Sequence, residues 1–259
     1  MDPIIITPLG TVSPYCKKEQ NCPAILINYK GKKILLDCGN GSTRLLNLPE
    51  DLKDLSVFIS HLHKDHYGDL SSVQYASYVY HNLGMLNEEV KIYLPHLDSD
   101  DETSVIKTAT AFANYRPINR ETVYTIDDIT ISFHDNNSHT IPCYAMKLAN
   151  DKFKIVYTSD IGNTNIAALV DFCHNANLLI CESSFVRSHN SSINTHLSAY
   201  EAGTIAKLAN VDKLMLTHFW PETPKSEYLK EAREVFSNTV VAEEGKQLVL
   251  SAKKVIELP

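Results

Sequence analysis

Residues 60–69 read Ser-His-Leu-His-Lys-Asp-His-Tyr-Gly-Asp, and this stretch guides the interpretation of the whole chain. It places His61, His63, Asp65 and His66 within six residues. Imidazole nitrogens and carboxylate oxygens are the ligands that zinc and similar metals take in proteins. A polar surface loop that is rich in histidine by chance is the alternative. Three histidines and one aspartate at this spacing favour a metal site.

The residues on either side predict rigid elements around this stretch. Residues 55–60 are an apolar run that predicts a buried strand ending at His61. Downstream, Val73, Ala76, Val79, Tyr80 and Leu83 recur at helical spacing, which predicts a helix over 70–86 with these side chains buried on one side. A loop that leaves a strand end between such elements can direct several side chains at one point.

The rest of the chain alternates between strand and helix patterns, which predicts sheets inside and helices outside. Further strands are expected at residues 4–7, 24–29, 33–37, 91–94, 122–125, 129–134, 143–148, 154–158, 178–181 and 213–217. Further helices are expected at residues 104–113, 165–173, 199–209 and 226–236.

Three more candidate ligands lie far from this stretch, each beside a predicted strand. His139 precedes the strand at 143–148, Asp160 follows the one at 154–158, and His218 follows the one at 213–217. Each of them alone could equally be a cap or turn residue.

The order His-x-His-x-Asp-His, followed by these three residues, resembles that of the metallo-β-lactamase superfamily. The resemblance implies a single domain over residues 1–259 with a four-layer αββα sandwich and a metal site at one edge of the two sheets. It implies two metal ions, zinc or alternatively manganese, with Asp160 between them. One ion would be held by His61, His63 and His139, and the other by Asp65, His66 and His218.

Two positions separate this chain from other branches of that superfamily. His63 stands where the flavodiiron branch carries Glu, so redox iron chemistry is not expected. Asp160 stands where common zinc β-lactamases carry Cys, so antibiotic hydrolysis is not expected either. A bridging carboxylate holds two metals roughly 3.5–4 Å apart, which suits displacement at phosphorus.

A second pair of segments narrows the branch further. Glu182 in Ile-Cys-Glu-Ser-Ser-Phe and His196 in Thr-His-Leu-Ser-Ala-Tyr-Glu-Ala resemble two segments of the ribonuclease Z-like group. The resemblance implies that Glu182 orients His196, which protonates the leaving oxygen or neutralises the phosphate. A phosphodiester leaving group benefits from such a general acid. The alternative is that His196 only precedes a helix. With Asp65, these residues are the candidate catalytic groups.

Composition restricts the class of protein. The 259 residues are 44% hydrophobic and 21% charged, enough for one large core, and no linker or repeat interrupts them. The chain has a net charge of −7 and so lacks the broad basic surface that binds long nucleic acids. No stable nucleic-acid complex is therefore expected. The first residues resemble neither a signal peptide nor a membrane span. Six scattered cysteines indicate reduced thiols, hence a cytoplasmic protein, in the host cytoplasm if the chain is viral.

The substrate is inferred from what the chain lacks. Transfer-RNA processors of the ribonuclease Z-like group carry a long arm between the positions matching His139 and Asp160, where this chain has only twenty residues. The continuation Phe-Trp-Pro-Glu at 219–222 resembles instead the armless bacterial and phage group, including anti-Pycsar phosphodiesterases, that opens cyclic mononucleotides. We therefore expect a cyclic-nucleotide phosphodiesterase. An RNA 3′-processing endonuclease and a metal-binding sensor or scaffold without turnover are the alternatives.

A homodimer is also expected. Tyr75, Tyr78 and Met85 form a second apolar face on the predicted helix at 70–86, and exposed aromatic stripes indicate an interface. Members of the ribonuclease Z-like group pair through the equivalent helix. The alternative is that a neighbouring loop covers the tyrosines. Two classes of residue are given no functional role: Gly39 and Gly41 as turn residues, and His81, His96, His134, His174 and His189 as ordinary polar residues.

Overall fold

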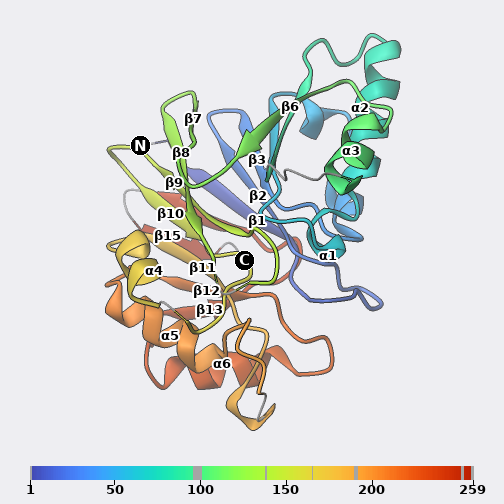
Figure 1. Ribbon diagram of the computed structural model, residues 1–259. Helices are drawn as coiled ribbons and strands as arrows, with labels where there is room; N and C mark the ends of the chain where they lie inside the picture. The colour runs from blue at the N-terminus through green and yellow to red at the C-terminus, as the bar shows by residue number, and fades with distance from the viewer. Residues whose placement is uncertain are drawn as a thin grey trace.

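Two β-sheets pack face to face, and helices cover the outer face of each (Figure 1). This computed structural model describes residues 2–95, 101–137, 139–164, 166–189, 192–251 and 254–257. The expected αββα sandwich is therefore confirmed.

The first sheet has the strand order β15-β14-β1-β2-β3-β4-β5-β6. Its strands are β1 (Ile4–Gly10), β2 (Ala24–Tyr29), β3 (Lys32–Leu36), β4 (Leu55–Phe58), β5 (Val90–Pro95), β6 (Ala113–Ile118), β14 (Leu248–Ser251) and β15 (Lys254–Glu257). The second sheet has the order β13-β12-β11-β10-β9-β8-β7. Its strands are β7 (Val123–Ile126), β8 (Ile129–Asp135), β9 (Tyr144–Ala149), β10 (Lys154–Tyr157), β11 (Leu178–Glu182), β12 (Leu214–Thr217) and β13 (Thr239–Val241).

The helices form the outer layers. The described helices are α1 (Lys64–Tyr67), α2 (Leu70–Asn82), α3 (Asp101–Thr108), α4 (Ile166–Cys173), α5 (Ala199–Leu208) and α6 (Lys225–Arg233). In Figure 1, α2 and α3 lie on the side of the first sheet, and α4, α5 and α6 cover the second. None of the described helices is long and apolar enough to cross a membrane.

Apolar side chains fill three layers, one between the sheets and one under each group of helices. Between the sheets, the rings of Phe58 and Tyr93 stack at 4.0 Å. Burying a side chain of this size stabilises the fold by about 1.5–3 kcal/mol. The packed sheets are therefore a rigid support for the loops at their edge.

Parallel strand pairs bring the carboxyl ends of several strands to one edge. In the first sheet β4 is parallel to β3 and β5, and in the second sheet β11 is parallel to β10 and β12. Loops that follow such strands meet at the same edge, where ligands of α/β proteins commonly bind. The predicted metal ligands lie in segments next to strand ends, with Asp65 and His66 in the one-turn helix α1 that follows β4.

Three helix predictions were wrong at their ends, one of them the helix predicted at 226–236, which ends at Arg233. Helix α2 stops at Asn82, because Gly84 adopts a left-handed φ of 69° that ends the helix. Leu83, expected to be buried, is therefore 64% exposed, and Gln74 lies on the buried face instead. Helix α3 stops at Thr108, because residues 113–118 pair with β5 as an edge strand. Of the helix predicted at 165–173, residue 165 lies outside the described residues.

Candidate metal centre

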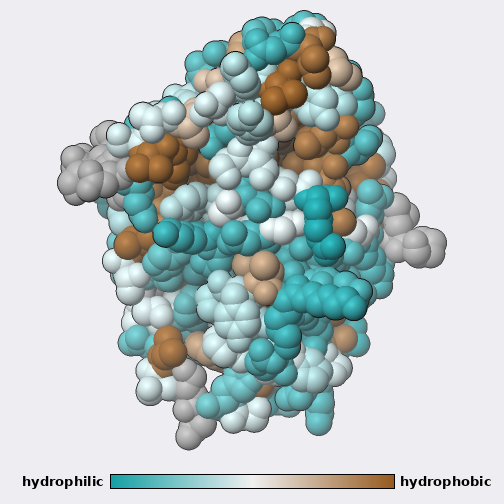
Figure 2. Space-filling model, turned by 90° about the vertical axis from the view of Figure 1, so that its right-hand side faces the viewer, coloured by the Kyte–Doolittle hydropathy of each residue, from teal (hydrophilic) through white to brown (hydrophobic). Residues whose placement is uncertain are grey.

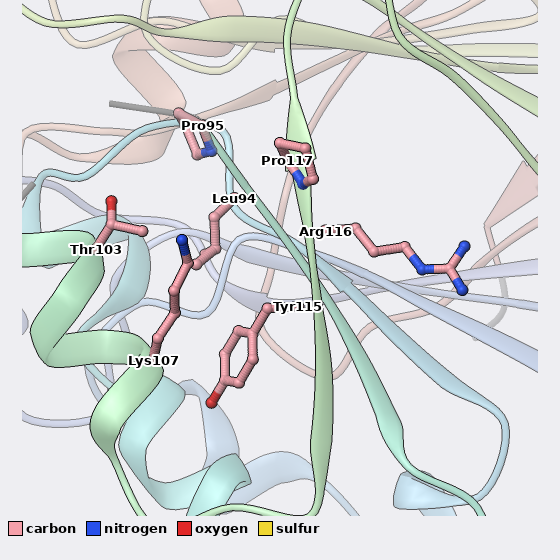
Figure 3. A pocket seen from close by; sticks show the side chains of 7 residues that line it. All are labelled: Leu94, Pro95, Thr103, Lys107, Tyr115, Arg116 and Pro117. Carbon is pink, nitrogen blue, oxygen red and sulfur yellow. The ribbon is translucent and has the colours of Figure 1, made fainter. Parts of the chain in front are cut away.

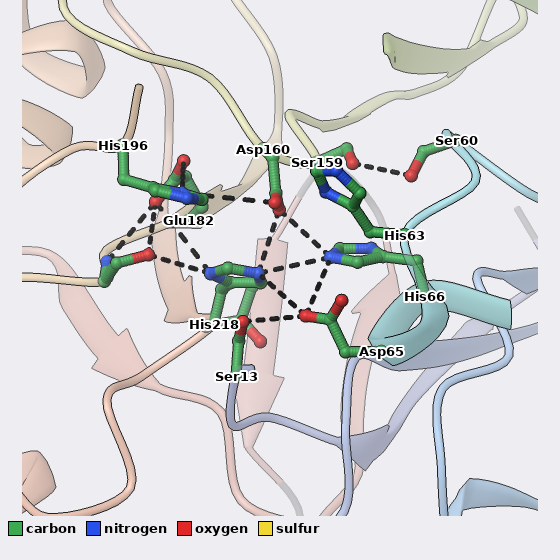
Figure 4. Close-up of polar contacts among 12 residues, drawn as sticks. Ser13, Ser60, His63, Asp65, His66, Ser159, Asp160, Glu182, His196 and His218 are labelled. Carbon is green, nitrogen blue, oxygen red and sulfur yellow. Dashed lines mark hydrogen bonds and ion pairs between the residues drawn. The ribbon is translucent and has the colours of Figure 1, made fainter. Parts of the chain in front are cut away.

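The stretch 60–69 forms a loop and the one-turn helix α1 directly after β4. His61 and His66 are buried, and His63 is partly exposed. Hydrogen bonds between backbone atoms hold the loop against the neighbouring strand end, because the Cys38 amide donates to the His66 carbonyl and the Asp69 amide donates to the Cys38 carbonyl. The imidazoles of His63 and His66 therefore lie near Asp160 on a fixed backbone (Figure 4).

Three histidines from two loops converge first. His61 Nε2 lies 3.1 Å from His63 Nδ1, and His139 Nε2 lies 3.0 Å from the same atom. Asp160 Oδ2 lies 3.5 Å from His61 Nε2 and 3.8 Å from His139 Nε2. These four residues form one group that could hold a metal ion. They are the residues expected around the first ion.

A second group lies on the other side of Asp160. His66 Nε2 and His218 Nε2 are 3.2 Å apart, and Asp65 Oδ2 lies 3.6 Å and 3.9 Å from them. Asp160 Oδ1 lies 3.1 Å from His66 Nε2 and 2.9 Å from His218 Nε2. Asp160 thus directs one oxygen to each group, as a bridging carboxylate would.

The charge states of four of these residues suit metal binding, whereas at His66 burial is outweighed by the nearby carboxylates of Asp160, Asp37 and Asp65, which raise its pKa well above the usual value. Burial lowers the pKa of His61, His63 and His139, so their imidazoles stay neutral at pH 7 and keep a lone pair for a cation. Burial alone would raise the pKa of Asp160, but the imidazoles of His218, His66 and His61 hold that pKa well below its usual range. The bridging carboxylate is therefore negative.

The donor set fits a pair of metal ions. Ring nitrogens of His61 and His139 both lie within 3.1 Å of His63 Nδ1, so a cation bound among them could share lone pairs from all three imidazoles. Asp160 Oδ1 is buried and accepts no hydrogen bond from the described residues. Nitrogen and carboxylate donors of this kind are those that zinc takes. The cluster is consistent with a dinuclear metal site.

Asp37, which we did not single out from the sequence, supports the centre from behind. Its carboxylate is fully buried and accepts hydrogen bonds from His66 Nδ1 at 2.8 Å, Tyr157 Oη at 2.7 Å and Ser60 Oγ at 2.9 Å. A carboxylate on the far nitrogen of a metal-binding histidine fixes the ring and its tautomer. Asp37 lies 29 positions before His66 in the sequence, and no local motif links the two residues, so the sequence did not predict that Asp37 orients His66.

Hydroxyl groups support three other presumed ligands in the same way. Ser184 Oγ lies 2.8 Å from His218 Nδ1, and Ser60 Oγ lies 3.0 Å from His61 Nδ1. Ser13 Oγ donates to Asp65 Oδ2 at 2.8 Å. These contacts come from loops of both sheets, so the orientation of the ligands depends on the packing of the whole edge.

Glu182 and His196 make the expected contact. His196 Nδ1 lies 3.0 Å from Glu182 Oε1 and 4.0 Å from Asp160 Oδ2. Burial alone lowers the pKa of His196, but the charge and hydrogen bond of Glu182 and the charge of Asp160 raise it to about 9. Glu182 is itself buried and accepts hydrogen bonds from the amide of Ile161 and the hydroxyl of Ser184. A charged His196 is therefore held beside the presumed metal ligands.

Three positions around the centre adopt strained backbone conformations. Asp37, Ser159 and His218 have φ values of 59°, 52° and 62°, although none of them is glycine. Such left-handed conformations are unfavourable and persist where the surrounding structure requires them, often at functional sites. Two of the three residues contribute carboxylate or imidazole groups to the centre described above.

The surface has a hollow beside the candidate metal centre and others away from it. A hollow of about 220 Å³ adjoins His196 and is lined by Asn163, Phe185, Val186, Arg187, Ile193, Ser198 and Glu201. Another, of about 260 Å³, lies between α3, β5 and β6, where Lys107 and Tyr115 face each other and Arg116 points away (Figure 3). Only the first contains a predicted site residue.

The residues expected to have no functional role are accounted for in part. Gly41 has a left-handed φ of 84°, as a turn requires, but Gly39 does not. At Gly39 a Cβ atom would lie 2.1 Å from the Asp65 carbonyl oxygen, so close packing of two loops explains the glycine. His96 lies outside the described residues. All six cysteines are free, and no described metal group contains one.

Comparison with known proteins agrees with this geometry. Residues 32–219, which include every predicted ligand, match the family model described as "Beta-lactamase superfamily domain". The chain belongs to the metallo-β-lactamase superfamily. The match begins at β3 and ends just after His218, so it covers the metal centre as well as Glu182 and His196.

Similar proteins place the chain within the superfamily. It is 29% identical over 244 residues to the "Probable metallo-hydrolase YhfI" of Bacillus subtilis (strain 168), covering 93% of this chain and 97% of that protein. The crystal structure of YhfI has a TM-score of 0.86 at 28% identity and covers 96% of this chain and 100% of that one. Ribonuclease Z of Archaeoglobus fulgidus is 27% identical over 299 residues, covering 92% of this chain and 95% of that protein.

The crystal structure of the human short-form tRNase Z has the same fold, with a TM-score of 0.74 at 20% identity over 96% of this chain and 99% of that one. Together with the His/Asp cluster, these likenesses identify the chain as a metal-dependent hydrolase of the superfamily, near YhfI and ribonuclease Z.

Proposed function

We propose that this protein is a two-metal phosphodiesterase that hydrolyses 3′,5′-cyclic mononucleotides. The observation that carries the proposal is the pair formed by Glu182 and His196 beside the bridging Asp160. His196, held by Glu182 next to Asp160, can supply a proton in addition to the activated water. A phosphodiester has a poor alkoxide leaving group and gains from an acid there.

In this proposal the predicted ligands hold two zinc ions, or two manganese ions. When bound, such a pair lowers the pKa of a water molecule and polarises the phosphate oxygens. Among the carboxylates around the centre, the Asp65 side chain is 12% exposed, whereas those of Asp160 and Glu182 are 3% and 1% exposed. Asp65 is therefore the carboxylate best able to accept the proton that the attacking water loses.

His196 completes the reaction. Because Nδ1 bonds to Glu182, Nε2 is the nitrogen that can protonate the leaving oxygen. The water oxygen bonds to phosphorus, the bond from phosphorus to the 3′ oxygen breaks, and that oxygen takes the proton from Nε2. The cyclic diester opens to a 5′-mononucleotide, and Glu182 stabilises the charged form of His196 before the transfer.

The short hairpin formed by β9 and β10 is evidence for a small substrate. These strands are antiparallel neighbours joined by residues 150–153, which leaves no room for an arm between His139 and Asp160. The alignment with the archaeal ribonuclease Z runs over 299 positions although this chain has 259 residues, so that relative has segments that this chain lacks. A mononucleotide needs only the centre and a modest pocket.

RNA 3′-processing is the second candidate. Its support is the likeness to ribonuclease Z over 92% of the chain. Against it stands the net charge of −7, which does not favour binding of a long polyanion.

The test compares substrates on the metal-loaded protein. We expect turnover of 3′,5′-cyclic AMP, GMP, CMP and UMP, with little cleavage of a 3′-extended precursor tRNA. Cleavage of the tRNA with the cyclic nucleotides untouched would favour the second candidate. If neither these substrates nor bis-p-nitrophenyl phosphate were hydrolysed, the protein would be a metal-binding sensor or scaffold.

The role of His196 has its own test. We expect His196→Ala to lower kcat for cyclic nucleotides by on the order of 10²–10⁴ with the metal content unchanged. The loss should be smaller for bis-p-nitrophenyl phosphate, because p-nitrophenolate leaves without a proton. Equal losses for both substrates would instead indicate that His196 positions the phosphate. His174→Ala is the matched control, since His174 is an exposed histidine and belongs to none of the described groups that could hold a metal ion.

A further inference from the structure

The hollow of about 220 Å³ is lined by His196, the residue proposed to protonate the leaving oxygen. The His196 imidazole bonds to Glu182 through Nδ1, and its side chain is 21% exposed where it lines the hollow. We place a leaving oxygen that takes a proton from His196 beside the exposed part of the ring, next to the residues that line the hollow. The group attached to that oxygen then extends into the hollow, away from the metal ligands.

We propose that this hollow binds the nucleoside of the substrate and that Phe185 is the residue on which the base stacks. The inference rests on the phosphodiesterase function proposed above and adds a residue that determines specificity. The volume of about 220 Å³ lies below the roughly 300–1,000 Å³ of sites for drug-sized ligands, so it suits one base rather than a longer chain.

The Phe185 ring is held in place from both sides. Its amide donates to the Leu197 carbonyl at 3.1 Å, and its carbonyl accepts from the Ala199 amide at 2.8 Å. The ring meets the rings of His189 and His196 nearly at right angles, at centroid distances of 6.0 Å and 6.2 Å. A preorganised aromatic ring loses little freedom when a base stacks on it, and every nucleobase has a face that can do so.

The charges around the hollow favour a neutral group over a second phosphate. Two cations are among the described lining residues: His196, which pairs with Glu182, and Arg187, whose guanidinium already pairs with Glu231 at 3.4 Å and with Glu234. The guanidinium also lies over the Tyr200 ring at 4.6 Å. Glu201 adds a negative charge to the lining. Because both cations are already paired with carboxylates, a neutral nucleoside fits the hollow better than the next phosphate of an RNA chain.

The tyrosines of α2, which could also have stacked on a base, belong to a different place. Tyr75 and Tyr80 line a separate groove with Leu48 and Ala109, and no predicted metal ligand lines it. Phe185, by contrast, lies next to His196 both in the ring contact and in the hollow.

The test measures binding of adenosine 5′-monophosphate and of ribose 5-phosphate, which lacks the base, to the metal-loaded protein by calorimetry. We expect the nucleotide to bind about tenfold or more tightly than the sugar phosphate. Phe185→Leu keeps an apolar side chain but removes the aromatic ring. It should bring the two affinities close together while leaving that of ribose 5-phosphate unchanged. Phe172→Leu, on α4 and outside the hollow, should behave as the wild type.

Two outcomes would overturn the inference. One is a preference for the nucleotide that Phe185→Leu leaves intact, and the other is a wild-type protein that binds both compounds equally. Failure of the proposed function has a separate signature, because the wild type would then open no cyclic nucleotide whatever the calorimetry gives. If Phe185→Leu hydrolysed cyclic nucleotides with an unchanged KM, the stacking role of Phe185 would be wrong, while the proposed phosphodiesterase function would stand.

Discussion

At the scale of single residues, the centre depends on how its ligands are held as much as on the ligands themselves. Asp37 connects three elements through one carboxylate, since His66 follows β4, Tyr157 ends β10 and Ser60 precedes the ligand loop. Burying a charge is unfavourable unless hydrogen bonds compensate it, and here three donors and the Ser60 amide do so. The carboxylate therefore both orients His66 and joins the two sheets.

We predict that Asp37→Asn weakens metal binding about 10- to 100-fold, because an amide cannot accept hydrogen bonds from His66 and Tyr157 as the carboxylate does. Chelator competition on the purified protein measures the affinity. Asp128→Asn is the matched control, since Asp128 also accepts from a tyrosine hydroxyl, that of Tyr29 at 3.3 Å, but contacts no histidine. An unchanged metal affinity in Asp37→Asn with normal folding would show that His66 is oriented by its other contacts.

The clustering of the presumed ligands was predictable from sequence, whereas the residues that support them were not. His61, His63, Asp65 and His66 lie within six residues, so a local pattern reveals them. Asp37 meets His66 across 29 positions and Tyr157 across 120, and such contacts depend on the packing of strands from both sheets. Ser13, Ser60 and Ser184 each contact a presumed ligand through a hydroxyl group, and serines are too common in any sequence for such a role to be predicted.

At the scale of elements, close packing of loops fixes the centre. Gly39 follows β3 and lies against the backbone of the ligand loop, where a Cβ atom would be 2.1 Å from the Asp65 carbonyl oxygen and 2.6 Å from the Cys22 carbonyl carbon. Both are backbone atoms, so relief requires that a loop moves.

We predict that Gly39→Ala lowers the free energy of unfolding by about 1–3 kcal/mol and also reduces metal content, because the loop that carries Asp65 must shift. Gly84→Ala is the control. Its Cβ would meet no atom within 4 Å, but its φ of 69° adds backbone strain, so stability should fall with metal content intact. Chemical unfolding and elemental analysis measure the two effects. Full metal content in Gly39→Ala would contradict the prediction.

Element types were predicted better than element ends. Strand β4, which precedes the loop at residues 60–69, was predicted because its side chains are buried on both faces and form a continuous apolar run. β6 was missed because it is an edge strand whose side chains are mostly exposed. The short strands β13 and β14 pair with β12 and β1, which are distant in sequence, so no local pattern contains these pairings. Strand β15 pairs with the neighbouring β14 as a hairpin at the sheet edge.

At the scale of the whole molecule, exposed apolar side chains gather on one outer layer. Tyr75, Tyr78, Leu83 and Met85 on or just after α2 are 61%, 43%, 64% and 46% exposed. Beside them lies a groove of about 690 Å³ lined by residues of α2 together with Leu48, Ala109 and Thr110. Figure 2, which shows this side of the molecule, has hydrophobic patches in its upper part amid a largely hydrophilic surface. Patches of this kind mark interaction sites.

We propose that a second copy of the chain covers this surface, so that the protein is a homodimer paired through α2. Aromatic side chains such as Tyr75 and Tyr78 are enriched in such interfaces, and a double change to glutamate would place like charges opposite each other across the symmetry axis. Tyr75→Glu with Tyr78→Glu should therefore give a monomer with unchanged metal content, measured by sedimentation velocity at micromolar concentration. Leu208→Glu, at a 60% exposed position on α5, is the control and should remain a dimer. A wild type that sediments as a monomer would reject the dimer, and a double variant that stays dimeric would move the interface to another face.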